Sequence, residues 1–235
     1  MKKFFTLVLA LFTFSCIFAK APKNQYVRIK TSYGQCIIRL YNETPKHRDN
    51  FIKLIKSKVL DSTLFHRIIQ NFMIQGGDID SKNAKPGIEL GNGGLKYTVD
   101  AEFNDSLYHK RGVLAAARES DDVNPKKASA STQFYIVEGK RYTDAEMDKL
   151  EAGRLKGHKI PASHRSVYRT VGGTPQLDNA YTVFGEVVLG IDMVDLIAAL
   201  PKDSHDRPLI NVPITIQLLK KRECKQLDKL LGINP

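Results

Sequence analysis

The chain of 235 residues lacks tryptophan, has only three cysteines and shows no internal repeat. A chain of this length can bury a substantial core by itself, so it needs no disulfide framework. The six histidines lack the paired spacing of metal ligands, which argues against a metal site. After the first residues, no run approaches the ~20 consecutive apolar residues of a transmembrane helix, so we expect no such span there.

Positive charge is in excess, with a formal net charge of +11. The basic residues are scattered, apart from short clusters at 126–127 and 220–222. No helix-turn-helix, zinc knuckle or aromatic-basic stripe accompanies them, so we expect no nucleic-acid partner. A solvated basic surface is the better interpretation, and it leaves open an affinity for acidic clients or an anionic membrane.

The first 21 residues resemble a secretory signal, with Lys2 and Lys3 before the apolar run 4–14 and small residues after it. Cys16 leaves two interpretations open. It is either the lipidated residue of a bacterial lipoprotein, or it is removed by cleavage after Ala19 or Ala21. We therefore expect an exported protein of the bacterial periplasm or envelope, attached to a membrane only if Cys16 carries lipid.

Two further cysteines, Cys36 and Cys224, would remain in the exported protein. Export permits a disulfide between them. Alternatively, both are small buried residues in separate strands, which is the interpretation we favour.

Short alternating segments dominate residues 26–222 and predict one mainly β domain. Strands are expected at 26–30, 35–41, 65–69, 113–117, 133–138, 181–189 and 210–219. Thr44-Pro45 opens one helix, and residues 191–200 form another. Seven or eight strands with two main helices indicate a closed β-barrel capped by helices.

Residues 140–174 are expected to be an insertion on this domain. Thr143 and Glu146 form a capping box that starts a helix running towards Gly153. An irregular stretch is predicted from there to Gly173, with too few apolar residues for a core of its own. Residues 223–235 are expected to be a C-terminal tail, which either forms a short helix or frays.

The segment 65–78, FHRIIQNFMIQGGD, places one arginine among apolar, amide and glycine residues. Alternation along a strand predicts Phe65, Arg67 and Ile69 on one side, with Met73 and Gln75 sharing a face after a turn. Glycines 76 and 77 then end the strand, since glycine tolerates the φ values of a sharp turn. A cation and an amide directed into an apolar pocket are expected.

This segment resembles the signature of the cyclophilin-type peptidyl-prolyl isomerases. Four further blocks are similar to that family in the same order: Thr44-Pro45-Lys46 with Asn50-Phe51, GVLAAAR at 112–118, STQFYI at 131–136, and LD with YTVFGEV at 177–187. The resemblance implies an eight-stranded antiparallel barrel closed by two helices. It also implies an X-Pro peptide bond as substrate, with no cofactor and no metal.

The resemblance assigns roles residue by residue. Arg67 is the expected catalytic donor, and Gln75 is expected to hold it or to contact a substrate carbonyl. An apolar slot for proline is expected from Ile69, Phe72, Met73, Tyr135 and Leu177. The neighbouring groove is expected from Ala117, Arg118 and Gln133, with Tyr181 closing the far side.

Four positions depart from the family pattern: Gln176 and Tyr181 at the far wall, Arg118 in the neighbouring groove, and Tyr135 in the proline slot. Gln176 stands where many members have tryptophan, which implies weak binding of cyclosporin. Arg118 stands where asparagine is common, Tyr181 where histidine is common, and Tyr135 where phenylalanine is frequent. None removes the arginine.

The function expected is therefore a monomeric, exported isomerase that accelerates X-Pro isomerisation in extended or unfolded polypeptides as they fold. The alternative is a catalytically weak module that binds proline-containing clients without useful turnover. His66 is expected to be structural, because the reaction transfers no obligatory proton.

Overall fold

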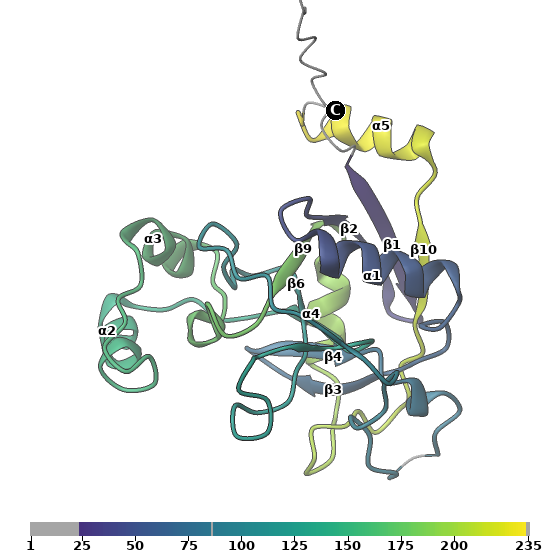
Figure 1. Ribbon diagram of the computed structural model, residues 1–235, viewed down its shortest axis with the longest axis horizontal. Coiled ribbons are helices and arrows are strands. Elements are labelled where there is room, and N and C mark those ends of the chain that lie inside the picture. Colours follow the sequence, from purple (N-terminus) through teal and green to yellow (C-terminus); the bar gives the residue numbers. More distant parts are fainter. Residues whose placement is uncertain (1–23, 86, 234–235) are drawn as a thin grey trace, which may run out of the picture.

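The computed structural model describes residues 24–85 and 87–233, which form a mainly β structure (Figure 1). Eight antiparallel strands form one sheet in the order β10-β1-β2-β9-β6-β8-β4-β3. Their bounds are β1 (Gln25–Thr31), β2 (Gly34–Leu40), β3 (Phe65–Ile69), β4 (Met73–Gly76), β6 (Val113–Ala116), β8 (Phe134–Val137), β9 (Val183–Leu189) and β10 (Thr215–Leu218). A separate pair joins β5 (Thr98–Val99) to β7 (Ser129–Ala130).

The sheet curls into a half-barrel, and the prediction of a closed barrel is wrong. The edge strands β3 and β10 share no ladder. Irregular backbone links them instead: Ser62 N–H donates to the Ile214 carbonyl (2.9 Å), and Ile214 N–H donates to that of Thr63 (2.8 Å). Pro213 interrupts the expected strand 210–219 because it has no N–H to donate, so β10 begins only at Thr215.

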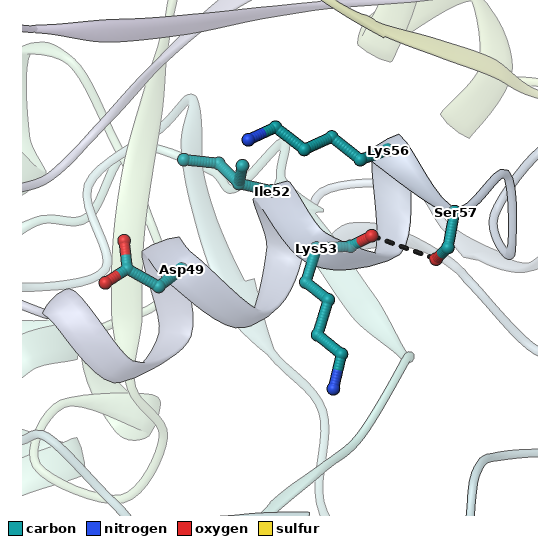
Figure 2. Close-up of a pocket in the computed structure, with 5 residues that line it drawn as sticks. All are labelled: Asp49, Ile52, Lys53, Lys56 and Ser57. Atoms are coloured by element: carbon teal, nitrogen blue, oxygen red, sulfur yellow. Dashed lines mark hydrogen bonds between the residues drawn. The ribbon is translucent and has the colours of Figure 1, made fainter.

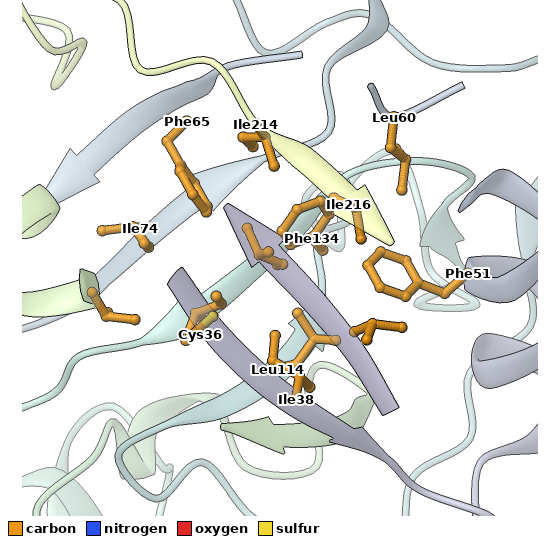
Figure 3. Close-up of a cluster of buried hydrophobic side chains, with 14 of the residues drawn as sticks. Cys36, Ile38, Phe51, Leu60, Phe65, Ile74, Leu114, Phe134, Ile214 and Ile216 are labelled. Carbon is orange, nitrogen blue, oxygen red and sulfur yellow. The ribbon is translucent and has the colours of Figure 1, made fainter. Parts of the chain in front are cut away.

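The interior of the curled sheet holds the main core (Figure 3). The ring of Phe51 meets those of Phe134 and Phe184 edge to face, each at 5.4 Å between centroids. Cys36 is fully buried in this core. Burial raises the pKa of its thiol to about 12, so the thiol stays protonated and is not a reactive nucleophile. Cys36 and Cys224 are both free, so there is no disulfide between them. The favoured alternative is confirmed for Cys36, which is buried in β2, and is wrong for Cys224, which is half-buried in the helix Lys221–Leu230.

Two helices cover this core as expected. They are α1 (Pro45–Lys56) and α4 (Asp192–Ala198), and both contribute buried residues to the interior cluster. At the start of α1, Thr44 holds the N-cap position, yet its hydroxyl makes no cap bond. The carboxylate of Glu102 accepts from the N–H groups of Lys46 and His47 (both 3.0 Å) instead.

The outer face of α1 is solvated. A hollow there is lined by Asp49, Ile52, Lys53, Lys56 and Ser57. Figure 2 shows the side chains of Lys53 and Lys56 pointing away from each other, and the Ser57 hydroxyl donating to the Lys53 carbonyl (2.9 Å) at the end of the helix.

The insertion forms two helices beside the sheet, α2 (Asp144–Ala152) and α3 (Ala162–Thr170) (Figure 1). The capping box of Thr143 and Glu146 is confirmed. The predicted irregular stretch is wrong over α3, a segment with few apolar residues in which Tyr168 is the buried side chain. Tyr168 packs with Met147 and Ile160 in a small cluster of its own.

Of the two forms left open for the C-terminal tail, the helix is the one present: α5 (Lys221–Leu230), which begins before residue 223. Asp228 ties this helix to β1 by accepting from Tyr26 Oη (2.7 Å) and Asn24 Nδ2 (2.9 Å). Within the described residues, no helix has the length and apolar character needed to cross a membrane. The expected signal sequence and Cys16 lie outside those residues.

Glu151 joins α2 to α3 and supplies a test of the insertion. Its buried carboxylate accepts from Lys159 Nζ (2.7 Å), Ile160 N (3.0 Å) and Arg165 Nη1 (2.8 Å). We expect Glu151→Gln to destabilise α2 and α3 by about 1–3 kcal/mol, because the donors lose a charged acceptor. Hydrogen exchange should accelerate in these two helices alone, whereas the exposed Glu119→Gln should change nothing.

The Glu151 carboxylate also determines how the stability of α2 and α3 depends on pH. The hydrogen bond from Lys159 is the largest cause of a lowered pKa at Glu151 in the folded protein. Its stabilising contribution is therefore complete above the ordinary glutamate pKa and is lost as the pH falls through the lower folded-state value. In wild-type protein, the protection of α2 and α3 against hydrogen exchange should fall at acid pH, and in the Glu151→Gln variant this fall should be absent. An equal fall in both proteins would contradict the assignment.

Candidate active site

The outer face of the sheet carries a second apolar cluster, distinct from the interior core. It arises because side chains alternate along a strand. In β8, Phe134 and Ile136 join the interior core, while Tyr135 and Val137 join the outer cluster. In β4, Ile74 packs inside and Met73 outside. The sheet is thus apolar on both faces, which is the arrangement a binding surface on its outside requires.

A cavity of about 180 Å³ opens over this outer cluster. Nine of the eleven predicted site residues line it: Arg67, Phe72, Met73, Gln75, Ala117, Arg118, Tyr135, Leu177 and Tyr181. The other two lie at its edges. Ile69 packs against the same apolar cluster, and Gln133 lines an adjoining groove that shares Gln75, Ala117 and Arg118 with the cavity.

Arg67 lies on β3 opposite Gln75 of β4. The register shifts between Phe65, which pairs with Gly76, and Arg67, so His66 is an extra residue in the strand. Alternation predicts Phe65 and Arg67 on the same face of the strand. Because of this bulge, Phe65 instead packs into the interior of the half-barrel. The side chain of Arg67 keeps 43% of its surface exposed and faces the cavity.

Asp206 holds Arg67 from outside the cavity, a partner that the sequence reasoning missed. Its Oδ2 lies 3.6 Å from Arg67 Nε, while its Oδ1 lies 2.6 Å from Lys202 Nζ. Its backbone carbonyl accepts from Ile68 N (2.8 Å), which fastens the loop to β3. Nothing local in the sequence marks this contact, because the two residues come from distant parts of the chain.

Two amides form a fixed chain at the other side of Arg67. Gln133 Nε2 donates to the carbonyls of Gly91 (2.8 Å) and Gly93 (2.9 Å), which fixes its orientation. Its Oε1 then accepts from Gln75 Nε2 (3.0 Å). The side-chain amide oxygen of Gln75, Oε1, stays available as an acceptor beside Arg67.

The end of β4 is shaped by two glycines for two different reasons. Gly77 has a φ of +88°, and a Cβ there would lie 2.2 Å from the Thr132 carbonyl oxygen. Gly76 has ordinary backbone angles, but a Cβ would approach Ile214 Cδ1 to 2.8 Å inside the barrel. Only the first supports the predicted reason, a turn with positive φ; the second is a matter of space.

A buried hydrogen-bond chain runs beneath the floor of the cavity. Tyr135 Oη lies 2.9 Å from His109 Nε2, and His109 Nδ1 lies 3.0 Å from Asp178 Oδ1. Tyr168 Oη, from the insertion, donates to Asp178 Oδ2 (2.6 Å). Burial raises the pKa of Tyr135 well above its ordinary value, so its hydroxyl remains protonated.

Arg118 and Tyr181 form the far wall as a packed pair. The Arg118 guanidinium lies 4.5 Å from the centre of the Tyr181 ring. Its Nε donates to the Ala180 carbonyl (2.7 Å), and Nη2 pairs with Asp121 (2.7 Å). Two of the four residues that depart from the family pattern, Arg118 and Tyr181, therefore stabilise each other.

His66 is 3% exposed, and burial lowers its pKa to about 4. A neutral, buried imidazole fits a structural residue better than an acid or base, although neither ring nitrogen has a hydrogen-bond partner among the described residues. No group of three or more ligating side chains that could hold a metal ion occurs in the part of the chain that the structure describes.

Comparison with known proteins assigns a family to this fold and site. The family model described as cyclophilin type peptidyl-prolyl cis-trans isomerase/CLD matches residues 26–217. A peptidyl-prolyl cis-trans isomerase of Acinetobacter baylyi is 32% identical over 190 residues, covering 80% of each chain. The chain therefore belongs to the cyclophilin-type peptidyl-prolyl cis-trans isomerase family.

Solved structures of the family agree with the fold. A cyclophilin type isomerase of Cryptosporidium parvum matches with a TM-score of 0.60 and 25% identity, covering 84% of this chain and 99% of that one. A structure of that protein in the presence of the dipeptide Ala-Pro matches with a TM-score of 0.59 and 26% identity, covering 84% and 100%.

Some relatives are much longer than the region they share with this chain. An isomerase-like protein of Rhizopus delemar is 31% identical over 194 residues, which cover 82% of this chain but 28% of that protein. A Streptococcus pyogenes relative, 35% identical, is covered to 37%. The chain thus spans about a third of these two proteins.

Competition for Asp206 gives a prediction about Arg67. Asp206→Asn should loosen the Arg67 side chain, because an exposed ion pair of about 0.2–1 kcal/mol is lost. Lys202→Gln should tighten it, because the carboxylate then serves Arg67 alone. NMR order parameters of Arg67 Nε–Hε measure both effects, and a change in the same direction for the two variants would rule out the competition.

Proposed function

We propose that this protein catalyses cis/trans isomerisation of X-Pro bonds in extended polypeptides. The observation that carries the proposal is the position of Arg67: a guanidinium held by Asp206 at the rim of a small cavity on the outside of the sheet, whose walls include the apolar side chains of Phe72, Met73 and Leu177. Apolar walls suit a proline ring, and the rim donor suits the amide that precedes it.

The reaction needs no broken bond. Rotation about a peptide bond has a barrier of ~18–20 kcal/mol, because resonance gives the C–N bond double-bond character. X-Pro bonds therefore exchange in roughly tens to hundreds of seconds. In the twisted amide, resonance is lost and the proline nitrogen regains a lone pair. A donor aimed at that lone pair stabilises the transition state more than either planar form.

Arg67 supplies this donor, since a guanidinium stays protonated and its planar fork is rigid. Met73, Phe72 and Leu177 grip the proline ring, with Tyr135 as the floor. The Gln75 carbonyl steadies Arg67, while the Gln75–Gln133 chain and the backbone near Ala117 orient the peptide. Catalysis then comes from positioning and electrostatics, and the chain's own residues suffice for it.

The clients we propose are exported polypeptides during folding. The signal-like first 21 residues, with lysines before a short apolar run, support export to the periplasm or envelope. Slow X-Pro exchange limits folding in any compartment, so an exported isomerase has substrates there.

Processing of the amino terminus tests the proposed localisation. Mass spectrometry of the protein purified from a bacterial host should find a mature chain that begins at lipidated Cys16 or after Ala19 or Ala21. A C16A variant should abolish membrane attachment in the first case and leave the soluble product in the second. An intact chain starting at Met1 would contradict export.

The activity itself is tested at Arg67. NMR exchange spectroscopy on a short Ala-Pro peptide should show accelerated cis/trans exchange with the wild-type protein. Arg67→Ala should reduce that rate about 10²–10³-fold with the fold intact, as loss of one transition-state donor does elsewhere. Arg67→Lys should fall between, because it keeps the charge and loses the fork.

An unchanged rate in Arg67→Ala would remove the assigned role. Peptide binding without exchange by the wild-type protein would favour the alternative, a module that binds proline-containing clients. The packed pair of Arg118 and Tyr181, where the family commonly has other residues, is the feature that favours this alternative.

A further inference from the structure

The insertion encloses a second cavity beside the proline site. This groove, of about 630 Å³, lies between the turn at 153–161, the segment 104–108 and the segment 175–180. Its apolar surfaces come from Leu107, Leu155, Ile160 and Pro161. None of the residues assigned to the proposed reaction lines it, so it is a separate place for a ligand.

One short segment divides the groove from the proline cavity. Gln176 and Asp178 to Ala180 line the groove, while Leu177 and Tyr181 line the cavity. Arg118 also connects the two, because its guanidinium binds the Ala180 carbonyl and pairs with Asp121 of the groove. A polypeptide with its proline in the cavity therefore has a flank within a few extended residues of the groove.

The groove is held in place before any ligand arrives. Tyr168 of α3 donates to Asp178, and Tyr142 Oη lies 3.4 Å from Gln176 Oε1. Backbone bonds from Thr174 N to the His109 carbonyl (2.8 Å) and from Arg111 N to that of Gly172 (2.9 Å) fasten the end of the insertion. A preformed site avoids part of the ordering cost of binding.

The acidic and basic side chains of the groove differ in whether they already have partners. Its carboxylates are already engaged: Asp178 by His109 and Tyr168, Asp121 by Arg118, and Asp105 by Asn179 Nδ2 (3.2 Å).

The cations are available instead. Among the described residues, Lys127, Arg154 and Lys156 belong to no ion pair, whereas Lys159 pairs with Glu151. His164 adds no positive charge, because burial lowers its pKa and its ring stacks on Tyr108 at 3.7 Å. Asp105 and Asp178 pair with no lysine or arginine of the described chain and so keep their charges, but the three unpaired cations still outnumber them, and the groove is positive on balance.

We propose that this groove binds acidic residues that flank the isomerised proline in a client polypeptide. Arg154 and Lys156 from the insertion, with Lys127 opposite, attract client carboxylates, while the apolar surfaces accept the neighbouring side chains. The proposal rests on the proposed function for the placement of the proline, and it makes the insertion a determinant of client choice.

The experiment compares longer peptides that each contain one proline and either a Glu-Glu pair or a Gln-Gln pair, moved stepwise along each flank. For at least one placement, kcat/KM for the acidic peptide should exceed that for its amide twin by about three- to tenfold at low salt. The ratio should shrink as ionic strength rises, since the cations are exposed. Fluorescence anisotropy of the labelled peptides should give the same ratio in affinity.

Charge reversal identifies the groove as the source. Arg154→Glu with Lys156→Glu should bring the acidic-to-amide ratio to one or below. Lys225→Glu with Lys229→Glu, an equal change of charge on the exposed side of α5, should leave the ratio as in the wild-type protein. A ratio of one in the wild type at every placement, or equal losses in the two double variants, would overturn the proposal.

The two proposals fail separately. If the short Ala-Pro peptide shows no accelerated exchange, the proposed activity fails, while the anisotropy ratio still tests the groove. If the short peptide exchanges rapidly and no acidic placement raises affinity, the groove fails and the activity stands.

Discussion

The alternation of side chains in β4, β6 and β8 is the constraint on which the rest of the structure depends. In each strand, one set of side chains packs into the interior of the half-barrel and the alternate set lies on its outer face. Ile74, Leu114 and Ile136 anchor the strands, so Met73 and Tyr135 can occupy fixed places on the outer face. A pocket built on strands in this way is rigid without a disulfide, a metal or a closed ring of strands.

The polar groups around this pocket form two hydrogen-bond chains, which start at Gln133 and Tyr135 of the same segment. On one side, Gln133 is oriented by loop carbonyls and in turn orients Gln75 next to Arg67. On the other, Tyr135 is joined through His109 and Asp178 to Tyr168 of the insertion. Because buried polar groups are costly to leave unpaired, this second chain couples the floor of the pocket to an element outside the barrel.

Much of the fold and site could be predicted from sequence because the signals were local. Alternation marked the strands, and the family resemblance carried Arg67, Met73 and Tyr135 to the cavity they line. The predictions that were wrong failed because of backbone irregularities or contacts between distant parts of the chain. A bulge at His66 turned Phe65 inward, Pro213 shortened the last strand, and α3 has few apolar residues to mark it, with Tyr168 as its buried side chain. Asp206 could not be found, since its partner lies on a strand far away in the chain.

The central claim is that the outer face of this sheet, and no other surface, receives the proline. Methyl NMR during titration with an Ala-Pro peptide tests it most directly, because inner and outer methyl groups alternate along the same strands. We expect shifts for Met73, Ala115, Ala117 and Leu177, with much smaller ones for Ile74, Leu114 and Ile136. Shifts concentrated on α1 or α5, with the outer methyl groups unchanged, would contradict the account.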